Sequence, residues 1–179
     1  MADVYPEKLA FTYWDNPILR KKTIDIEEKE SQNTREFIEA MLEKLVEHDG
    51  LGLAANQVGS DRRICLVAFP RKGDFSEVKA LINPRILGES EEVIENDEGC
   101  LSFPGLYLKI NRPERIEVQA YIPGEGDVRF EAEGILARII CHEVDHLDGI
   151  VFIDRISKIR RSLIKRQLRE IIENYGSKR

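Results

Sequence analysis

The sequence predicts an α+β fold, in which small antiparallel sheets pack around one buried helix and a C-terminal helix lies outside them. The buried helix is predicted over residues 135–148, where apolar side chains occur on nearly every side. Short apolar or alternating stretches, which are typical of strands, occur at residues 64–69, 79–82, 115–122 and 128–133. Turn residues at 123–127 join the last two stretches, so we expect an antiparallel hairpin there.

An amphipathic helix is the first element that the sequence predicts, beginning near Asn33. Asn33 and Glu36 have the spacing of a capping box, and Gly50 is placed to end the helix. Apolar side chains recur with helical spacing at Phe37, Ile38, Met41, Leu42, Leu45 and Val46. One face of this helix is therefore expected to pack on the core.

The predicted buried helix also carries polar side chains, which conflict with its burial. These are His142, Glu143, Asp145 and His146. An unpaired polar group in a protein core costs on the order of a few kcal/mol. The four side chains therefore need partners or a function, and they are the strongest functional signal in the sequence.

The last predicted helix runs from about Ser157 to Tyr175 and is basic. Residues 155–179 carry nine Lys or Arg and two Glu, a net charge of +7, whereas the other 154 residues carry −13. We expect its apolar positions to pack on the body, at Ile159, Leu163 and Leu168. Outward cations on an acidic protein predict a polyanionic partner such as nucleic acid, although a solvated helix face would have the same sequence.

Length and composition limit the class of protein. A chain of 179 residues, at roughly 150 per domain, predicts one domain over 1–179, made of a body (1–154) and the basic helix (155–179). Hydrophobic residues at 42% and charged residues at 34% exclude general disorder. The longest apolar run, 64–69, is too short to span a membrane, and no secretory signal is visible, so we expect a cytoplasmic protein. Three cysteines cannot form a full disulfide framework.

The buried helix contains an HExxH sequence, His142 to His146. Residues four apart lie on one helical face, so both imidazoles can bind one metal ion, while Glu143 can reach a nearby water without being a ligand. A metal that performs chemistry commonly has three protein ligands. No histidine follows the helix, and Cys100, which follows a glycine that permits a tight turn, is the candidate third ligand. Without this context, Cys100 would be interpreted as a small buried hydrophobe.

Three motifs together resemble the peptide deformylase family: GxGLAAxQ at 50–57, EGCLS at 98–102 and HExDHLxG at 142–149. The likeness extends from Asp15 to Ile156, and the C-terminal helix is similar to that of the bacterial type. The resemblance implies removal of the formyl group from N-formylmethionine of nascent polypeptides during bacterial translation. It also implies one divalent ion, usually ferrous iron in the cell, although zinc, nickel or cobalt suits the same ligands.

The resemblance implies a role for each site residue. Cys100, His142 and His146 would bind the metal, and Glu143 would move a proton from the attacking water to the departing amine. The Gln57 amide and the Leu101 backbone N–H would stabilise the oxyanion. The methionine side chain would lie among Leu51, Gly52, Ile135 and Ile139, with Glu98 beside it. We expect Asp145 to orient a ligand histidine.

The chain departs from the common family pattern at two positions. Asn56 stands where proline is common, and Cys141, which we interpret as a packing residue, stands where glutamine is common. Two alternatives to a deformylase are an HExxH zinc peptidase and a non-catalytic metal module that docks on the ribosome. The first is disfavoured because no downstream His or Glu ligand is found, and the second because a structural site has no use for Glu143.

Overall fold

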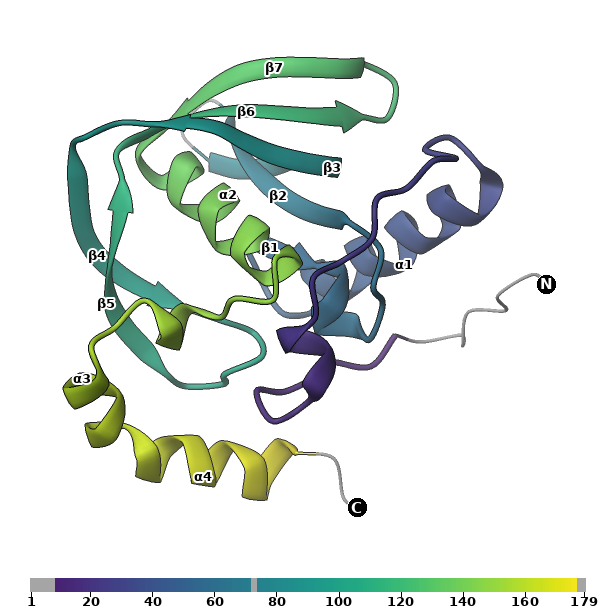
Figure 1. The fold of residues 1–179 in the computed structure, drawn as a ribbon. Helices are drawn as coiled ribbons and strands as arrows, with labels where there is room; N and C mark the ends of the chain where they lie inside the picture. The colour runs from purple at the N-terminus through teal and green to yellow at the C-terminus, as the bar shows by residue number, and fades with distance from the viewer. Residues whose placement is uncertain (1–8, 72–73, 177–179) are drawn as a thin grey trace.

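The computed structural model describes residues 9–71 and 74–176, which form helices packed against two antiparallel sheets (Figure 1). The α-helices in these ranges are α1 (Gln32–Glu47), α2 (Gly134–Leu147), α3 (Lys158–Leu163) and α4 (Lys165–Tyr175). Short 3-10 helices lie in the connections: η1 (Pro17–Arg20), η2 (Ala55–Val58) and η3 (Phe152–Asp154). Within the described ranges, none of the helices has the length and apolar character needed to cross a membrane.

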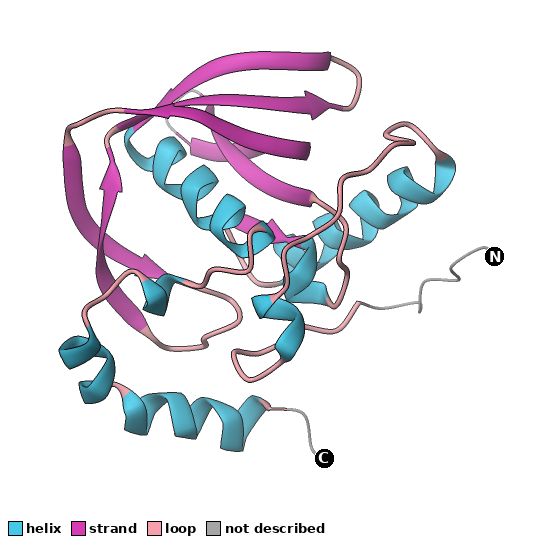
Figure 2. Cartoon of the chain, in the orientation of Figure 1, coloured by secondary structure: helices cyan, strands magenta, loops and turns pink. Residues whose placement is uncertain are grey.

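The larger sheet has five antiparallel strands in the order β1-β2-β3-β6-β7. These strands are β1 (Gly52–Ala54), β2 (Ile64–Arg71), β3 (Asp74–Glu89), β6 (Arg115–Ile122) and β7 (Gly126–Glu133). A smaller sheet pairs β4 (Val93–Gly99) with β5 (Tyr107–Pro113). Figure 2 shows α2 between the two sheets, and it contacts strands of both. The predicted fold class and the predicted hairpin are confirmed.

The strand β2 separates two cores, which explains its continuous apolar sequence. Cys65 and Val67 pack in the core that contains α2, whereas Ile64 and Leu66 pack in the core that contains α1. Because both faces of β2 are covered, apolar residues occupy successive positions rather than alternate ones. The predicted buried helix is also confirmed, since Ala137 to Leu147 of α2 are all buried.

The start of α1 differs from the prediction. Ser31 is the N-cap, and its Oγ accepts a hydrogen bond from the backbone N–H of Thr34 at 3.2 Å. The predicted capping box at Asn33 and Glu36 is therefore wrong: the helix begins at Gln32, and the Asn33 side chain instead accepts from Arg62. Serine has the same capping chemistry as asparagine, so residue type alone does not distinguish Ser31 from Asn33 as the N-cap.

The C-terminal segment is two helices rather than one, and two predicted packing positions are wrong. Ile159 and Leu163 are 76% and 77% exposed. The chain leaves α3 at Ile164, and the buried side chains from there on are Ile164, Leu168 and Ile171. The break changes which side of the segment faces the body, and a helical repeat cannot reveal such a break.

The strands β4 and β5 were both missed; β4 does not alternate, whereas β5 does, with Leu108 and Ile110 facing inward between exposed residues. Five successive residues of β4, from Val93 to Asp97, are exposed, and three of them are polar or charged. A strand that is solvated on both sides lacks the period-two pattern on which prediction depends. Residues 1–8, 72–73 and 177–179 lie outside the description, so the prediction of one domain over 1–179 stays a prediction.

Candidate metal centre

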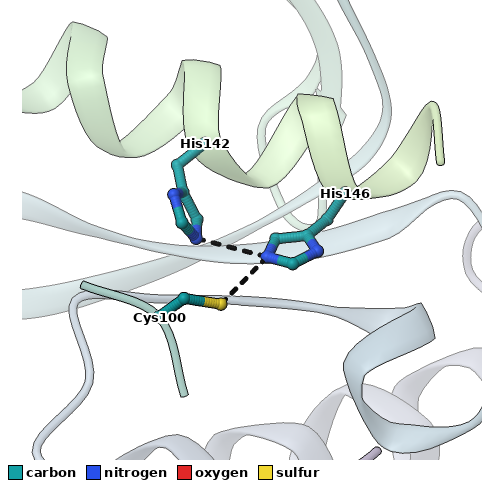
Figure 3. Close-up of side chains that lie close together, drawn as sticks. All are labelled: Cys100, His142 and His146. Atoms are coloured by element: carbon teal, nitrogen blue, oxygen red, sulfur yellow. Dashed lines mark hydrogen bonds between the residues drawn. The ribbon is translucent and has the colours of Figure 1, made fainter. Parts of the chain in front are cut away.

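Three side chains with metal-binding atoms converge at the inner side of α2 (Figure 3). His142 and His146 project from consecutive turns of the helix, with their Nε2 atoms 3.2 Å apart. Cys100, in the turn after β4, brings its Sγ to 3.2 Å from Nε2 of His146. The three ligand atoms all lie within 4.8 Å of one another. A single ion fits this arrangement, and a thiolate with two imidazoles is a donor set that zinc and iron accept.

Gly99, next to Cys100 at the end of β4, lies close to the ring of the exposed Tyr107. A Cβ on Gly99 would lie 2.7 Å from a carbon of the Tyr107 ring, on the paired strand β5. After Cys100 the chain turns, and the Phe103 N–H donates to the Cys100 carbonyl at 2.9 Å. The tight approach of the two strands and this turn together direct the thiol toward α2.

Glu98 orients His142, a role that the sequence analysis had assigned to Asp145. Nδ1 of His142 lies 2.6 Å from a Glu98 carboxylate oxygen, so a proton on Nδ1 leaves the Nε2 lone pair available for an ion. Arg112 donates to both oxygens of the same carboxylate, at 2.7 and 3.1 Å, and Arg138 adds a contact at 3.2 Å. Burial raises the pKa of Glu98, but His142 and Arg112 outweigh it and hold the pKa well below the usual value.

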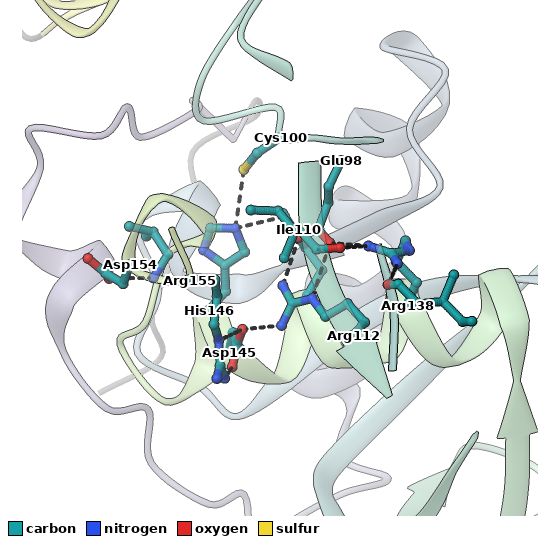
Figure 4. A network of polar contacts seen from close by, with 12 residues as sticks. Glu98, Cys100, Ile110, Arg112, Arg138, Asp145, His146, Asp154 and Arg155 are labelled. Carbon is teal, nitrogen blue, oxygen red and sulfur yellow. Dashed lines mark hydrogen bonds and ion pairs between the residues drawn. The ribbon is translucent and has the colours of Figure 1, made fainter. Parts of the chain in front are cut away.

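The expectation that Asp145 orients a histidine is wrong. Its carboxylate accepts hydrogen bonds from Arg112 and Arg155, as Figure 4 shows. Arg112 therefore joins Asp145 to Glu98 in one buried network. The residues 145 and 142 are three apart on α2, and Asp145 projects toward the arginines rather than toward a ring nitrogen.

The surroundings of His146 favour its neutral form. Burial, followed by the charges of His142 and Arg112, lowers the pKa of His146 well below its usual value. A neutral imidazole is the form that binds metal. Nδ1 of His146 is buried and has no hydrogen-bond partner among the residues that the structure describes.

Glu143 is buried beside the cluster, next to the backbone of β1. Its Oε2 has no hydrogen-bond partner within residues 9–71 and 74–176. Burial, the largest influence, raises its pKa to about 7. A Cβ on Gly52 would lie 2.3 Å from Glu143 Oε1, so only glycine leaves room for this carboxylate. A carboxyl group with this pKa can both accept and return a proton near neutral pH.

The side-chain amide of Gln57, on η2, is oriented by a hydrogen bond to its oxygen. Oε1 accepts from the Ala54 N–H at 2.8 Å, which turns the amide nitrogen toward Cys100 Sγ at 3.5 Å and Ser102 Oγ at 3.3 Å. The neighbouring Asn56 donates to the carbonyl of His146 and so ties η2 to the end of α2. An amide N–H is therefore aimed at the metal-binding cluster.

A cavity of about 570 Å³ opens onto this cluster. The predicted site residues that line it are Leu51, Gly52, Gln57, Glu98, Cys100, Leu101, Ile135, Ile139, His142 and Glu143. His146 is not among the lining residues and is 1% exposed. Cys141 is buried in the α2 core, where burial raises the pKa of its thiol to about 12, in agreement with a packing role.

The sequence analysis missed Arg112 and Arg138, because single arginines in a strand and a helix carry no distinguishing pattern. It also missed Phe11, Tyr13 and Tyr175, which line the cavity from both ends of the described chain. Their contribution depends on how the first and last described segments pack against the body, which local sequence does not show.

A mixed helix and sheet fold with a Cys-His-His cluster and an adjoining glutamate is an arrangement typical of metallohydrolases. A family model described as polypeptide deformylase matches residues 8–162. The chain belongs to the polypeptide deformylase family, and its named relatives are enzymes. The resemblance seen in the three motifs is therefore confirmed.

Individual relatives match along most of the chain. The peptide deformylase of Rhizobium meliloti (strain 1021) is 36% identical over 164 residues, which cover 91% of this chain and 93% of that protein. The peptide deformylase of Natranaerobius thermophilus is 40% identical over 147 residues, covering 82% and 91%. The crystal structure of peptide deformylase from Ehrlichia chaffeensis in complex with actinonin matches with a TM-score of 0.85 at 32% identity, covering 95% of this chain and 99% of that one. A plant peptide deformylase matches with a TM-score of 0.86 at 30% identity, covering 97% and 94%.

Proposed function

We propose that this protein removes the formyl group from the N-formylmethionine of nascent polypeptides during bacterial translation, in the cytoplasm. The observation that carries the proposal is the buried Glu143 carboxylate beside the converging Cys100, His142 and His146, at the wall of an open cavity. Membership of the polypeptide deformylase family supports the same activity.

We propose that Cys100, His142 and His146 hold one divalent metal ion. Ferrous iron is the ion that we expect in the cell, and zinc, nickel or cobalt fits the same sulfur and nitrogen donors. When bound, such an ion supplies Lewis acidity and lowers the pKa of a water molecule. The Glu98 carboxylate acts on His142, whose ring it holds with Nε2 facing the other two ligand atoms.

Glu143 would carry the proton in the reaction. It would accept a proton from the water that attacks the formyl carbon and return it to the departing amine, so that formate and a free N-terminus are produced. A pKa of about 7 matches both steps, because the carboxyl group is neither too weak a base nor too weak an acid. Gly52 leaves the space in which this carboxylate lies.

Gln57 and Leu101 would stabilise the oxyanion that forms on the formyl oxygen. The amide nitrogen of Gln57 is oriented by the Ala54 N–H, and the Leu101 backbone N–H would be the second donor. Donors that are positioned before the reaction contribute about 2.7–4 kcal/mol each in other enzymes. Leu51, Gly52, Ile135 and Ile139 would bind the methionine side chain, with Glu98 beside them.

The test compares the hydrolysis of formyl-Met-Ala with that of unformylated Met-Ala-Ser by the metal-loaded protein. We expect formate release from the first peptide and no cleavage of the second, whereas an HExxH peptidase would cleave internal bonds. Glu143→Ala should retain the metal and lose at least a thousandfold in kcat, because only the proton carrier is removed. Near-normal turnover in this variant would show that Glu143 is not the base.

We also propose that the basic helices α3 and α4 dock on ribosomal RNA. Their exposed cations are Lys158, Arg160, Lys165, Arg166 and Arg169. Arg161 is excluded from this set, because it is occupied by Asp154 and by the carbonyl of Ile153. Phosphate contacts release counterions, so binding should weaken steeply with salt. Co-sedimentation with ribosomes across a salt series should show weaker binding and a shallower salt dependence for Lys165→Glu/Arg169→Glu, and identical curves would refute docking.

A further inference from the structure

Two tyrosines from opposite ends of the described chain meet at the wall of the catalytic cavity. The rings of Tyr13 and Tyr175 have centroids 5.4 Å apart and an interplanar angle of 35°. Both residues line the cavity that holds Glu143 and the metal-binding cluster. Tyr13 is partly buried, whereas Tyr175 is 48% exposed. The pair therefore presents aromatic surface to the cavity and to solvent at once.

The position of Tyr13 is set by its neighbour Thr12. The Thr12 N–H donates to the Gln57 carbonyl at 2.7 Å, and its hydroxyl donates to the Asn56 carbonyl at 2.8 Å. Thr12 is thereby fastened to η2, the element that carries the proposed oxyanion donor. Phe11 and Tyr13, on either side of Thr12, both line the cavity.

The position of Tyr175 is set by the packing of α4. Leu168 and Ile171 are buried against the body, and the indole N–H of Trp14 donates to the Leu168 carbonyl at 2.8 Å. Figure 1 shows the yellow α4 running beneath the purple N-terminal segment. The last turn of α4, with Tyr175, is thus brought to the catalytic cavity although it follows His146 by 29 residues in sequence.

Phe11 extends the same aromatic wall toward α1. Its ring meets the ring of His48 edge to face, with centroids 4.7 Å apart, and His48 also lines the cavity. The Tyr13 phenol is neutral at neutral pH, as a tyrosine ordinarily is, and burial, followed by the influence of Tyr175, raises its pKa further, so it can donate a hydrogen bond. Tyrosine combines apolar area with a polar group at a small entropic cost, which suits the binding of peptides.

We propose that Tyr13 and Tyr175 bind the part of the substrate peptide that follows its first residue, and that they favour an apolar or aromatic side chain there. This inference rests on the proposed deformylase function. A polypeptide whose formyl group lies at Glu143 has to leave through the rest of the cavity, where Phe11, Tyr13 and Tyr175 present aromatic rings. The C-terminal helix α4 is then part of the substrate-binding surface.

The test measures kcat/KM for formyl-Met-Ala, formyl-Met-Ala-Phe-Ala and formyl-Met-Ala-Ser-Ala with wild type, Tyr175→Ala and Tyr175→Phe. Leu163→Ala is the matched control, because Leu163 is exposed on the same C-terminal segment and does not line the cavity. We expect Tyr175→Ala to lower the ratio of kcat/KM for the Phe peptide to that for the dipeptide about 5- to 10-fold, through KM. Tyr175→Phe should retain most of this ratio, and Leu163→Ala all of it.

The fluorescence of Trp14, the single tryptophan of the chain, reports whether α4 is still docked in each variant. An unchanged ratio in Tyr175→Ala, or an equal loss on all three peptides, would overturn the proposal while leaving the enzyme active. Failure of the proposed function has a different signature, since wild type would then release formate from none of the peptides.

Discussion

At the scale of single residues, the site contains close contacts that a larger side chain would disturb. Gly52 is the clearest case, because the position a Cβ would occupy is taken by the Glu143 carboxylate. The resemblance to the family placed Gly52 beside the methionine side chain of the substrate. The structure shows a close approach to a side chain of α2, so the small residue serves the proposed catalytic base as well.

Gly52→Ala should therefore displace Glu143 and lower kcat at least tenfold, without loss of bound metal. The measurement is formate release together with metal content by elemental analysis. Gly88→Ala is the control, because the nearest atom to its Cβ, in Glu117, lies 4.0 Å away. Full activity in Gly52→Ala would show that the position of Glu143 adjusts freely.

Glu98 is a second residue whose contacts define its role. Glu98→Gln should weaken metal binding about 10- to 100-fold, because the amide orients the His142 ring less strongly than the carboxylate does. Competition with a zinc chelator measures the affinity. Glu95→Gln, on the same strand but exposed, should leave the affinity unchanged. Equal affinity in wild type and Glu98→Gln would mean that the contact with His142 does not support the metal.

At the scale of elements, prediction succeeded where one pattern covered a whole element. The run at Ile64 and the alternation at Ile116 reflect burial on two faces and on one face of their strands. Prediction failed for β4, which has no buried face over most of its length, and for the helix break at Ile164. An exposed strand such as β4 has no pattern to recognise, and burial in α4 is decided by its contacts with distant segments.

In the site, too, local geometry could be predicted from the sequence, whereas contacts between distant segments could not. The HExxH spacing predicted that His142 and His146 would face one point, because helix geometry alone determines it. The partner of His142 could not be predicted, since Glu98 and Asp145 are both acidic and only the fold decides which of them reaches the ring. Arg112, which joins these two carboxylates, comes from a strand that the sequence did not indicate.

The break between α3 and α4 makes a direct prediction about stability. Ile164 is buried with Leu168, whereas the adjacent Leu163 is exposed. Ile164→Ala should lower the free energy of unfolding by about 2–4 kcal/mol through loss of buried area and a residual cavity, and Leu163→Ala by less than about 0.5 kcal/mol. Urea denaturation of the two variants checks this. The reverse order would indicate one continuous helix in the predicted register.

At the scale of the whole molecule, an ion pair joins the N-terminal region of the described chain to its C-terminal region. Asp154, on η3, accepts from Arg20 on η1 and from Arg161 on α3, and it also accepts from the Val151 N–H at 3.0 Å. The same N-terminal region carries Tyr13 to the cavity. The carboxylate of Asp154 therefore connects η1, η3 and α3.

This contact predicts a specific dependence of stability on pH. Burial raises the pKa of Asp154, but the Val151 N–H and then Arg20 and Arg161 outweigh it, so its pKa lies below the ordinary value of 3.8. A carboxyl group with a lowered pKa in the folded state stabilises the protein fully above the unfolded-state pKa, and this stabilisation is lost as the pH falls through the folded-state pKa. The variant to test is Asp154→Asn, which removes the charge and keeps the shape.

We expect Asp154→Asn to lower Tm by about 2–4 °C near neutral pH, the shift that corresponds to roughly 1 kcal/mol in a protein of this size. The difference in Tm between wild type and variant should stay constant from about pH 5 to pH 8 and shrink below about pH 4, as first the unfolded-state and then, at lower pH, the folded-state carboxylate of the wild type becomes protonated. Asp127→Asn, which removes an exposed ion pair with Lys29, is the control and should change Tm by less than about 1 °C. A difference that persists undiminished at acid pH would show that Asp154 stabilises the fold by its shape and hydrogen bonds rather than by its charge.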